Sequence, residues 1–335
     1  MTSCRKWVLA KRPEGIPSTD DFRLEESALP EVQDGQALIR VDYISVDPGM
    51  RSRLSGDSYA PALALGATIE SAGIGKVVAS RNAKLKEGAL VWGGFGWQSE
   101  MISDGRGIQA LDPELYKDKI KPTSAIGLFG IPGLTAFFGL FEIGKPKQGN
   151  TVVISSAAGT VGATAGQIAK IQGCTVIGLA GSDAKCAYLK EIGFDTAINY
   201  KTAGDLTAAF KAAAPKGVDV YFDNVGGETL DAAILNMRKN GRIVVSGQIS
   251  EYNTQTPRGI RHTLPFITQR LKMEGLVVYD FAVQFDEARM QMAEWVKEDK
   301  LSYREEIIEG IENTPEAFIG LFSGDSFGRR LVHVS

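Results

Sequence analysis

The residues best suited to chemistry in this chain form a glycine-rich turn. The apolar, β-branched run 151–155 predicts a strand, and the segment 161–172 predicts an amphipathic helix. The turn between them matches a dinucleotide-binding fingerprint, with Ala157 in place of its usual first glycine. Such a turn presents free N–H groups and the positive end of a helix dipole to a pyrophosphate. Because a packing turn in any α/β domain can look the same, this pattern alone leaves both interpretations open.

Each glycine of the turn has an expected role. Gly159 lets the backbone pass close to the pyrophosphate, and Gly162 keeps a β-carbon out of the approach between helix and phosphate. Gly166 lets the helix pack tightly on the sheet. We expect Gly159, Thr160, Val161 and Gly162 to contact the cofactor.

The tip of the second expected strand, 174–180, bears on the choice of cofactor. In an NAD-binding unit this tip carries a carboxylate that binds the ribose 2′-hydroxyl. Here Gly181 and Ser182 follow the strand, and the nearest acid, Asp183, is expected to cap the next helix. The hydroxyl of Ser182 and the ammonium of Lys185, with no acid at the tip, favour a 2′-phosphate and hence NADP(H). A solvated lysine on a helix face is the alternative for Lys185.

Length and composition set bounds on the protein. Its 335 residues predict two domains or one large one. The net charge of −3, from 37 basic and 40 acidic residues, argues against a nucleic-acid or anionic-membrane partner. No apolar run approaches the roughly 20 residues that cross a bilayer. The amino-terminal residues lack an apolar signal core, so we expect a cytoplasmic protein.

Histidine and cysteine are too scarce for two common kinds of active site. The chain has three cysteines without metal-ligand spacing and two histidines, His262 and His333. We therefore expect no metal. A serine hydrolase is similarly disfavoured, because the chain has no G-x-S-x-G motif.

The order of expected elements divides the chain near Pro122. Short β-like runs at 36–46, 73–80, 89–93 and 97–103 predict a compact barrel of antiparallel strands. From 124 to 300 strands and helices alternate, which predicts a doubly wound parallel sheet. The strands are expected at 151–155, 175–179, 196–199, 219–222, 242–246 and 276–279, and further helices at 183–192, 203–214, 228–240 and 286–297. The tail 301–335 reads as strand, helix, strand, and we expect it to complete the first domain, 1–123.

Several motifs occur in one order along nearly the whole chain. They are G-I-P-G-L-T-A at 130–136, A-A-G-T-V-G at 157–162, G-S-D-A-K at 181–185, N-Y-K at 199–201, D-N-V-G-G at 223–227, I-S-E-Y-N at 249–253 and G-D-S-F-G at 324–328. With them the chain resembles a zinc-free medium-chain dehydrogenase/reductase. It is similar to the prostaglandin reductase and leukotriene hydroxydehydrogenase group, which includes plant and bacterial alkenal and one double-bond reductases.

The resemblance implies a GroES-like catalytic domain, a Rossmann domain that binds NADPH, and an active site in the cleft between them. By motif match, Lys185 and Tyr200 would hold the 2′-phosphate, and Asn224 would touch the cofactor ribose. Tyr252 would line the nicotinamide end and is the candidate catalytic residue. The other residues expected at the cofactor are Ser246, Gly247, Ile249, the backbone of Leu276, Val277 and Val278 at the carboxamide, and Ser326.

Two positions depart from the pattern of the group. Ser326 stands where asparagine is common, and its hydroxyl has a shorter reach. Gly49 stands where a tyrosine often overhangs the substrate, so this chain has no phenol there to donate a proton.

The function implied is NADPH-dependent reduction of an α,β-unsaturated ketone or aldehyde, with hydride addition at the β-carbon. The enolate oxygen would take a hydrogen bond from Tyr252, the cofactor ribose or a backbone N–H. Quinone reduction, oxidation of a secondary alcohol, and NADPH binding without catalysis are the alternatives. We expect a homodimer paired through sheet edges.

Overall fold

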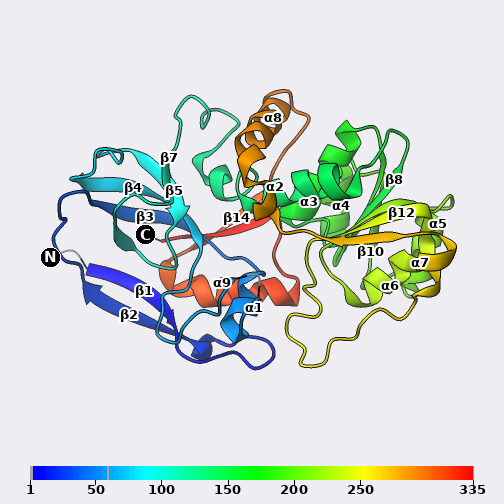
Figure 1. Cartoon of the computed structure of the whole chain (residues 1–335), viewed down its shortest axis with the longest axis horizontal. Helices are drawn as coiled ribbons and strands as arrows, with labels where there is room; N and C mark the ends of the chain where they lie inside the picture. Colours follow the sequence, from blue (N-terminus) through cyan, green and yellow to red (C-terminus); the bar gives the residue numbers. More distant parts are fainter. Residues whose placement is uncertain (1–2, 59, 335) are drawn as a thin grey trace. The chain divides into compact units, whose positions relative to one another are not determined.

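A computed structural model describes residues 3–58 and 60–334, which form two compact units (Figure 1). The first unit takes in the chain up to Ile126, together with Glu305–Ser326 and the residues from Arg330 on. The second unit is Gly127–Arg304 with Phe327–Arg329. The tail, 301–335, is thus shared, because residues 301–304 and 327–329 belong to the second unit.

The first unit is built on a seven-stranded sheet and a two-stranded sheet. The larger sheet has the order β14-β15-β3-β4-β5-β7, and β6 also pairs with β3. Its strands are β3 (Ala37–Ser45), β4 (Ala72–Ser80), β5 (Leu90–Gly94), β6 (Glu100–Ser103), β7 (Ile108–Ala110), β14 (Glu305–Glu309) and β15 (Arg329–His333). The smaller sheet pairs β1 (Ser3–Leu9) with β2 (Phe22–Ala28) in antiparallel register. The helices are α1 (Met50–Ser55) and α9 (Thr314–Ser323).

Aromatic side chains fill the core of the first unit. Trp97 and Phe318 are buried, and their rings meet edge to face with centroids 5.7 Å apart. The strand, helix, strand pattern expected for the tail is confirmed by β14, α9 and β15. The sequence did not predict β1 and β2, because their charged and half-exposed positions mask the alternation typical of strands.

The second unit contains the expected doubly wound sheet. Its strands are β8 (Thr151–Ile154), β9 (Thr175–Ala180), β10 (Thr196–Asn199), β11 (Val218–Asp223), β12 (Met237–Val245) and β13 (Lys272–Gly275). All neighbours pair in parallel in the order β10-β9-β8-β11-β12-β13. In order of appearance this is 3-2-1-4-5-6, the arrangement of dinucleotide-binding domains.

Helices cover both faces of this sheet. Figure 1 shows α3 (Thr160–Ile171) and α4 (Asp183–Glu191) on one side and α5 (Leu206–Ala213) and α6 (Gly227–Asn236) on the other. The remaining helices of the unit are α2 (Ile131–Phe138), α7 (Leu264–Thr268) and α8 (Phe285–Lys297). Buried aliphatic strands such as β8 have the continuous apolar character of a sheet covered on both faces.

The last strand of the sheet corrects the sequence prediction. We expected it at 276–279, but β13 is Lys272–Gly275, and a 3₁₀ segment begins at Val278. The strand lies at the edge of the sheet and is mostly exposed, so it lacks the apolar run of a buried strand. The helix expected at 228–240 also ends early, at Asn236, where β12 begins.

In the part of the chain that the structure describes, no helix is both long enough and apolar enough to pass through a membrane.

Candidate functional site

The residues expected at the cofactor line one edge of the parallel sheet. Because the strands are parallel, their carboxyl ends share this edge, where ligands bind in such folds. With one exception, every expected residue follows the carboxyl end of β8, β9, β10, β11, β12 or β13. The exception is Ser326, which belongs to the first unit. The structure thus brings together residues spread from 159 to 278.

The turn after β8 has the conformation needed to open a helix toward a ligand. Ser156 lies in the left-handed region at φ 49°, and Gly159 caps α3 without a side-chain hydrogen bond. A β-carbon at Gly159 would meet no described atom closer than the Ser156 carbonyl oxygen at 3.5 Å, so the approach is open. The amino end of α3 therefore fits a pyrophosphate.

The two following glycines serve packing within the protein. A β-carbon at Gly162 would lie 2.5 Å from the Ser156 carbonyl oxygen, so this glycine lets α3 fit against its own turn. The prediction that Gly162 also clears space for the phosphate stays a prediction. A β-carbon at Gly166 would lie 1.9 Å from the Phe194 ring, so close packing requires this glycine, but the neighbour is a side chain in the loop before β10 and not a strand of the sheet.

Strands β8 and β11 are tied together where the chain reverses its winding direction. Asn224 donates from its backbone N to the Ser155 Oγ atom and from Nδ2 to the Ser155 carbonyl oxygen, both at 2.8 Å. Ser155 Oγ in turn donates to Asp223 Oδ1 at 3.1 Å. These bonds fix the Asn224 amide at the edge where a dinucleotide ribose lies in this fold.

The buried Asp223 carboxyl organises the loop after β11. Its Oδ1 atom accepts hydrogen bonds from Tyr221 Oη at 3.0 Å and from the backbone N of Val225 and Gly226 at 3.1 and 3.0 Å. Its Oδ2 atom has no hydrogen-bond partner among the described residues. Burial raises the pKa of Asp223, although the bonds from Gly226 and Val225 act in the opposite direction.

The carboxyl ends of β9 and β10 form the expected 2′-phosphate region. Ser182, and not Asp183 as expected, caps α4, because its Oγ accepts the backbone N–H of Lys185 at 3.3 Å. Asp183 Oδ1 instead accepts a hydrogen bond from Asn199 Nδ2 at 2.7 Å. A β-carbon at Gly181 would lie 2.8 Å from the phenol oxygen of Tyr200, which is 40% exposed.

Tyr252 reaches back to the ends of β11 and β12. Its phenol oxygen accepts the backbone N–H of Gln248 at 3.3 Å, and a β-carbon at Gly247 would lie 3.2 Å from that oxygen. The Ser246 and Gly247 N–H groups donate to the Asp223 carbonyl oxygen at 2.8 and 3.1 Å. The half-buried phenol therefore lies beside the Asp223 loop.

Three other expected residues follow the edge strand. The N–H of Leu276 donates to the Val245 carbonyl oxygen at 3.0 Å, which continues the β12–β13 pairing by one residue. Val277 is exposed and Val278 is buried at the start of the 3₁₀ segment. Ile249 donates its N–H to the Asn224 carbonyl oxygen at 3.3 Å.

The residues present do not fit a metal ion. Within residues 3–58 and 60–334, no group of three or more His, Cys, Asp or Glu side chains could hold one. Cys4, Cys174 and Cys186 are free thiols, and burial raises the pKa of both Cys174 and Cys186.

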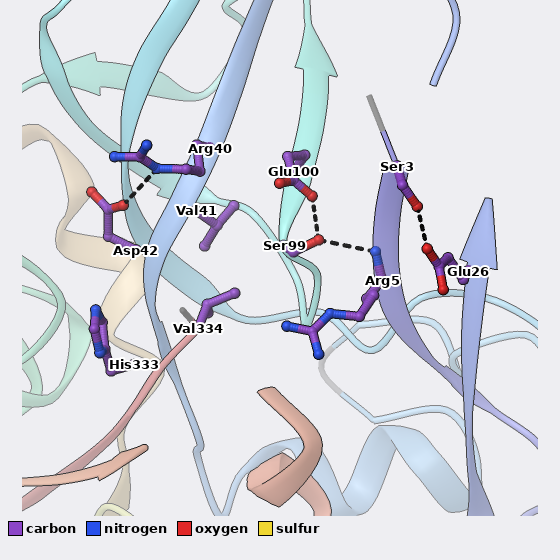
Figure 2. Close-up of a pocket in the computed structure, with 10 residues that line it drawn as sticks. All are labelled: Ser3, Arg5, Glu26, Arg40, Val41, Asp42, Ser99, Glu100, His333 and Val334. Atoms are coloured by element: carbon purple, nitrogen blue, oxygen red, sulfur yellow. Dashed lines mark hydrogen bonds and ion pairs between the residues drawn. The ribbon is translucent and has the colours of Figure 1, made fainter. Parts of the chain in front are cut away.

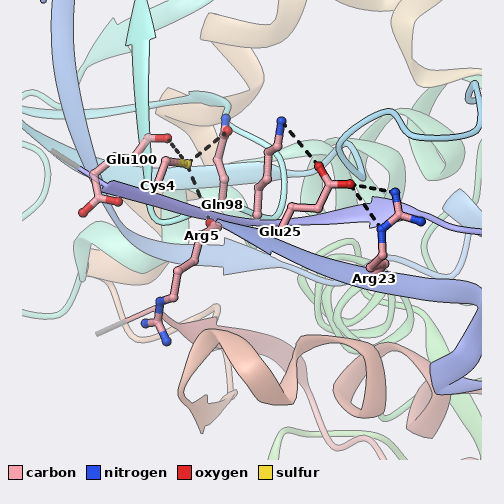
Figure 3. A network of polar contacts seen from close by, with 7 residues as sticks. Cys4, Arg5, Arg23, Glu25, Gln98 and Glu100 are labelled. Atoms are coloured by element: carbon pink, nitrogen blue, oxygen red, sulfur yellow. Dashed lines mark hydrogen bonds and ion pairs between the residues drawn. The ribbon is translucent and has the colours of Figure 1, made fainter. Parts of the chain in front are cut away.

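A pocket in the first unit contains none of the expected site residues. This hollow has a volume of about 470 Å³, and Figure 2 shows the residues that line it. Arg40 Nε lies 3.3 Å from Asp42 Oδ1, and Ser3 Oγ donates to Glu26 Oε1 at 2.6 Å. A polar network adjoins it, in which the Cys4 thiol donates to the Glu100 carbonyl oxygen at 3.0 Å (Figure 3). These groups satisfy one another, so we assign the pocket no ligand.

The sequence analysis missed two residues of the site edge. Asp223 stood within a quoted motif at the end of an apolar strand, and that position was the available signal for a buried organising carboxyl. Lys201 also stood within a quoted motif, N-Y-K at 199–201, but was given no role. Its Cε atom would lie 3.3 Å from a β-carbon at Gly181, which places a second lysine near the expected 2′-phosphate.

Comparison with known proteins covers both units. A family model described as the N-terminal domain of oxidoreductase matches residues 5–111, and one described as zinc-binding dehydrogenase matches residues 160–298. The NADPH-dependent curcumin reductase of Escherichia coli (strain K12) is 40% identical over 340 residues, 99% of this chain and 97% of its own. Prostaglandin reductase 1 of Rattus norvegicus is 42% identical over 335 residues, 99% of each chain.

A solved structure also resembles this chain over nearly its whole length. CurA from Vibrio vulnificus, in complex with NADPH, superposes with a TM-score of 0.92 at 37% identity and covers 99% of both chains. The resemblance predicted from the motifs is confirmed. The chain belongs to the medium-chain dehydrogenase/reductase family, in the zinc-independent group of the prostaglandin reductases.

Proposed function

We propose that this protein is an NADPH-dependent reductase of the C=C bond in α,β-unsaturated ketones and aldehydes. The observation that carries the proposal is the Tyr252 phenol beside Gly247, at the carboxyl ends of β11 and β12. The similarity to a curcumin reductase and a prostaglandin reductase over 99% of the chain supports this class of substrate.

Separate groups at the sheet edge bind separate parts of the cofactor. The amino end of α3 binds the pyrophosphate, and Lys185 and Tyr200 bind the 2′-phosphate. The Asn224 Nδ2 atom is committed to Ser155, and Oδ1 accepts no hydrogen bond from the described residues, so Oδ1 is the acceptor offered to a ribose hydroxyl. When bound, NADPH supplies the hydride for the β-carbon.

The chain's own contribution to the reaction is to orient and to stabilise charge. Negative charge develops on the carbonyl oxygen of the substrate, and the Tyr252 phenol donates a hydrogen bond to it. The same phenol accepts the Gln248 N–H at 3.3 Å, which helps to fix the position of its oxygen. We assign protonation of the α-carbon to water, because Gly49 stands where the related reductases often have a tyrosine.

The test is NADPH oxidation with matched enones, enals, quinones and saturated ketones, with identification of each product. We expect saturated ketones or aldehydes from enones and enals. Quinol formation with no enone turnover would identify a quinone reductase instead. NADPH binding without consumption of any acceptor would identify a non-catalytic protein.

We also propose a homodimer paired through β13. This strand ends the sheet, and its outer edge pairs with no other strand within the described residues. Near it Leu264 is 66% exposed and Ile267 is 74% exposed. An exposed strand edge beside apolar side chains favours pairing with a second copy. Sedimentation analysis should show a dimer that Ile267→Asp weakens and Leu65→Asp, on the first unit, leaves intact.

The three free thiols support the cytoplasmic location that we propose, since reducing compartments keep cysteines unpaired. Fractionation of cells that make the protein, with compartment markers, tests this location.

A further inference from the structure

A short piece of the tail pairs with the expected pyrophosphate turn. We call residues Phe327–Arg329 the tail segment, and they belong to the second unit. The Gly328 N–H donates to the Ala158 carbonyl oxygen at 3.0 Å, and Gly328 forms a parallel bridge with Gly159. Gly159 is the residue that caps α3. The tail segment therefore holds the backbone from which the amino end of α3 begins.

Two side chains, Arg304 and Tyr188, pack against the Phe327 ring of the tail segment. The Arg304 Cζ atom lies 4.1 Å from the centroid of the Phe327 ring. The Tyr188 ring on α4 meets Phe327 edge to face, with centroids 5.0 Å apart and planes at 83°. Arg304 is exposed and forms no ion pair with any residue in the described ranges, so Phe327 is its close partner. This is the geometry of a cation–π contact combined with an aromatic pair.

Backbone contacts between the tail segment and Arg304 add to these side-chain contacts. The Arg329 N–H donates to the Arg304 carbonyl oxygen at 2.8 Å. Gly328 has φ 78°, and a β-carbon there would lie 2.4 Å from the same carbonyl oxygen. Gly328 is thus required both by its backbone conformation and by the close approach of Arg304.

We infer that Phe327 and Arg304 are positioning residues for the pyrophosphate turn. The ring holds the tail segment, the tail segment holds Ala158 and Gly159, and these hold the donors at the start of α3. The inference rests on the proposed function, because it takes this turn as the pyrophosphate site. Their inferred role is to keep the turn in the conformation that binds.

A comparison of NADPH binding with NADH binding tests this mechanism. NADPH and NADH share the pyrophosphate and differ in the 2′-phosphate. Loss of the contacts to Phe327 should therefore weaken the binding of NADPH and NADH by the same factor. Loss of a 2′-phosphate ligand would weaken the binding of NADPH alone.

The experiment is direct titration of Phe327→Leu and Arg304→Met with NADPH and with NADH, without an acceptor substrate. We expect each variant to raise both dissociation constants about five- to thirtyfold, with the NADPH to NADH ratio unchanged. Turnover at saturating NADPH should stay near wild type. Phe322→Leu is the matched control, because its ring pairs edge to face with Phe318 in the first unit, and it should bind as wild type does. Phe327→Tyr keeps the ring and should also bind normally.

The outcomes separate this inference from the proposed function. Unchanged dinucleotide binding in both test variants, even with a lowered melting temperature, would show that the contacts to Phe327 stabilise the fold without positioning the turn. A loss confined to NADPH would place its effect at the 2′-phosphate and overturn the inference. Wild-type protein that binds neither dinucleotide would overturn the proposed function and the inference together. Failure to reduce enones, with dinucleotide binding intact, would overturn the proposed function alone.

Discussion

The phenol of Tyr200 occupies the place that a side chain at position 181 would take. A β-carbon at Gly181 would come within 2.8 Å of the phenol oxygen and 3.1 Å of the ring carbon that bears it. Tyr200 follows β10 and Gly181 follows β9, so packing between two strand ends keeps this position small. The tip of β9 therefore has no room for the carboxylate that binds a ribose 2′-hydroxyl in NAD-binding units.

Lys185→Ala should weaken NADPH binding by about one to two decades and leave NADH nearly unchanged. A charge-assisted contact with phosphate contributes about 1.5–3 kcal/mol, and only NADPH carries the 2′-phosphate. Titration with both cofactors measures the effect. Lys211→Ala, on the exposed face of α5, is the control. Equal weakening of both cofactors would exclude Lys185 as a ligand of the 2′-phosphate.

Tyr252→Phe should lower kcat by about a hundredfold and change NADPH binding only modestly. We propose that the removed hydroxyl donates to the developing enolate oxygen, and loss of one such donor costs about 10²–10³ in kcat. Turnover should remain measurable, because hydride transfer requires no side-chain acid. Steady-state kinetics separates the two roles, since a residue that only orients the cofactor would mainly raise the KM for NADPH. Wild-type kcat, KM and stereochemistry would show that Tyr252 merely anchors its loop.

Gly49→Tyr should shift specificity toward smaller substrates. The backbone at Gly49 has φ −61° and ψ −22°, which any residue adopts without strain, so the substitution is feasible. The missing overhanging ring predicts that the wild-type enzyme favours bulky aryl or cyclic enones over small enals. Relative kcat/KM over a series of enones of increasing size measures the shift. An identical profile in both proteins would rule out a role for position 49 in substrate size.

Activity should survive exhaustive chelation. The described residues offer no group of ligands for a metal ion, and the proposed reaction uses hydrogen-bond donors in place of a Lewis acid. Elemental analysis of the active enzyme should find no stoichiometric zinc. Stoichiometric zinc whose removal abolishes turnover would overturn the zinc-independent mechanism.

Asp195→Asn should reduce stability at neutral pH, and the difference from wild type should shrink in acid. Burial alone would raise the pKa of Asp195, but hydrogen bonds from Lys170 and the backbone N of Val176 outweigh it and lower the pKa. A carboxyl with a lowered folded pKa stabilises the protein above its unfolded pKa, and this stabilisation is lost as pH falls through the folded value. Urea unfolding of both proteins from pH 7 to below about pH 4 measures this difference. A difference that grows in acid would contradict the lowered pKa.

The sequence by itself determined the class of fold, and it predicted the residues of the candidate site. The run 151–155, its small-residue turn and the following helical periodicity predicted β8 and α3 because these signals are local. The absence of an acid after 180 predicted NADP(H) before any packing was known. Local signals failed at β13, because an exposed edge strand needs no apolar run, and at Asp183, because Ser182 competes for the same helix cap.

Tertiary structure alone decided the relationships between residues far apart in the chain. No spacing in the sequence shows that Tyr200 fills the space above Gly181, or that Gly162 fits against Ser156. The same holds for the bond between Gly328 and Ala158, which are 170 positions apart. These contacts depend on how strands and helices pack in three dimensions, whereas helix and strand patterns depend on neighbours within a few residues.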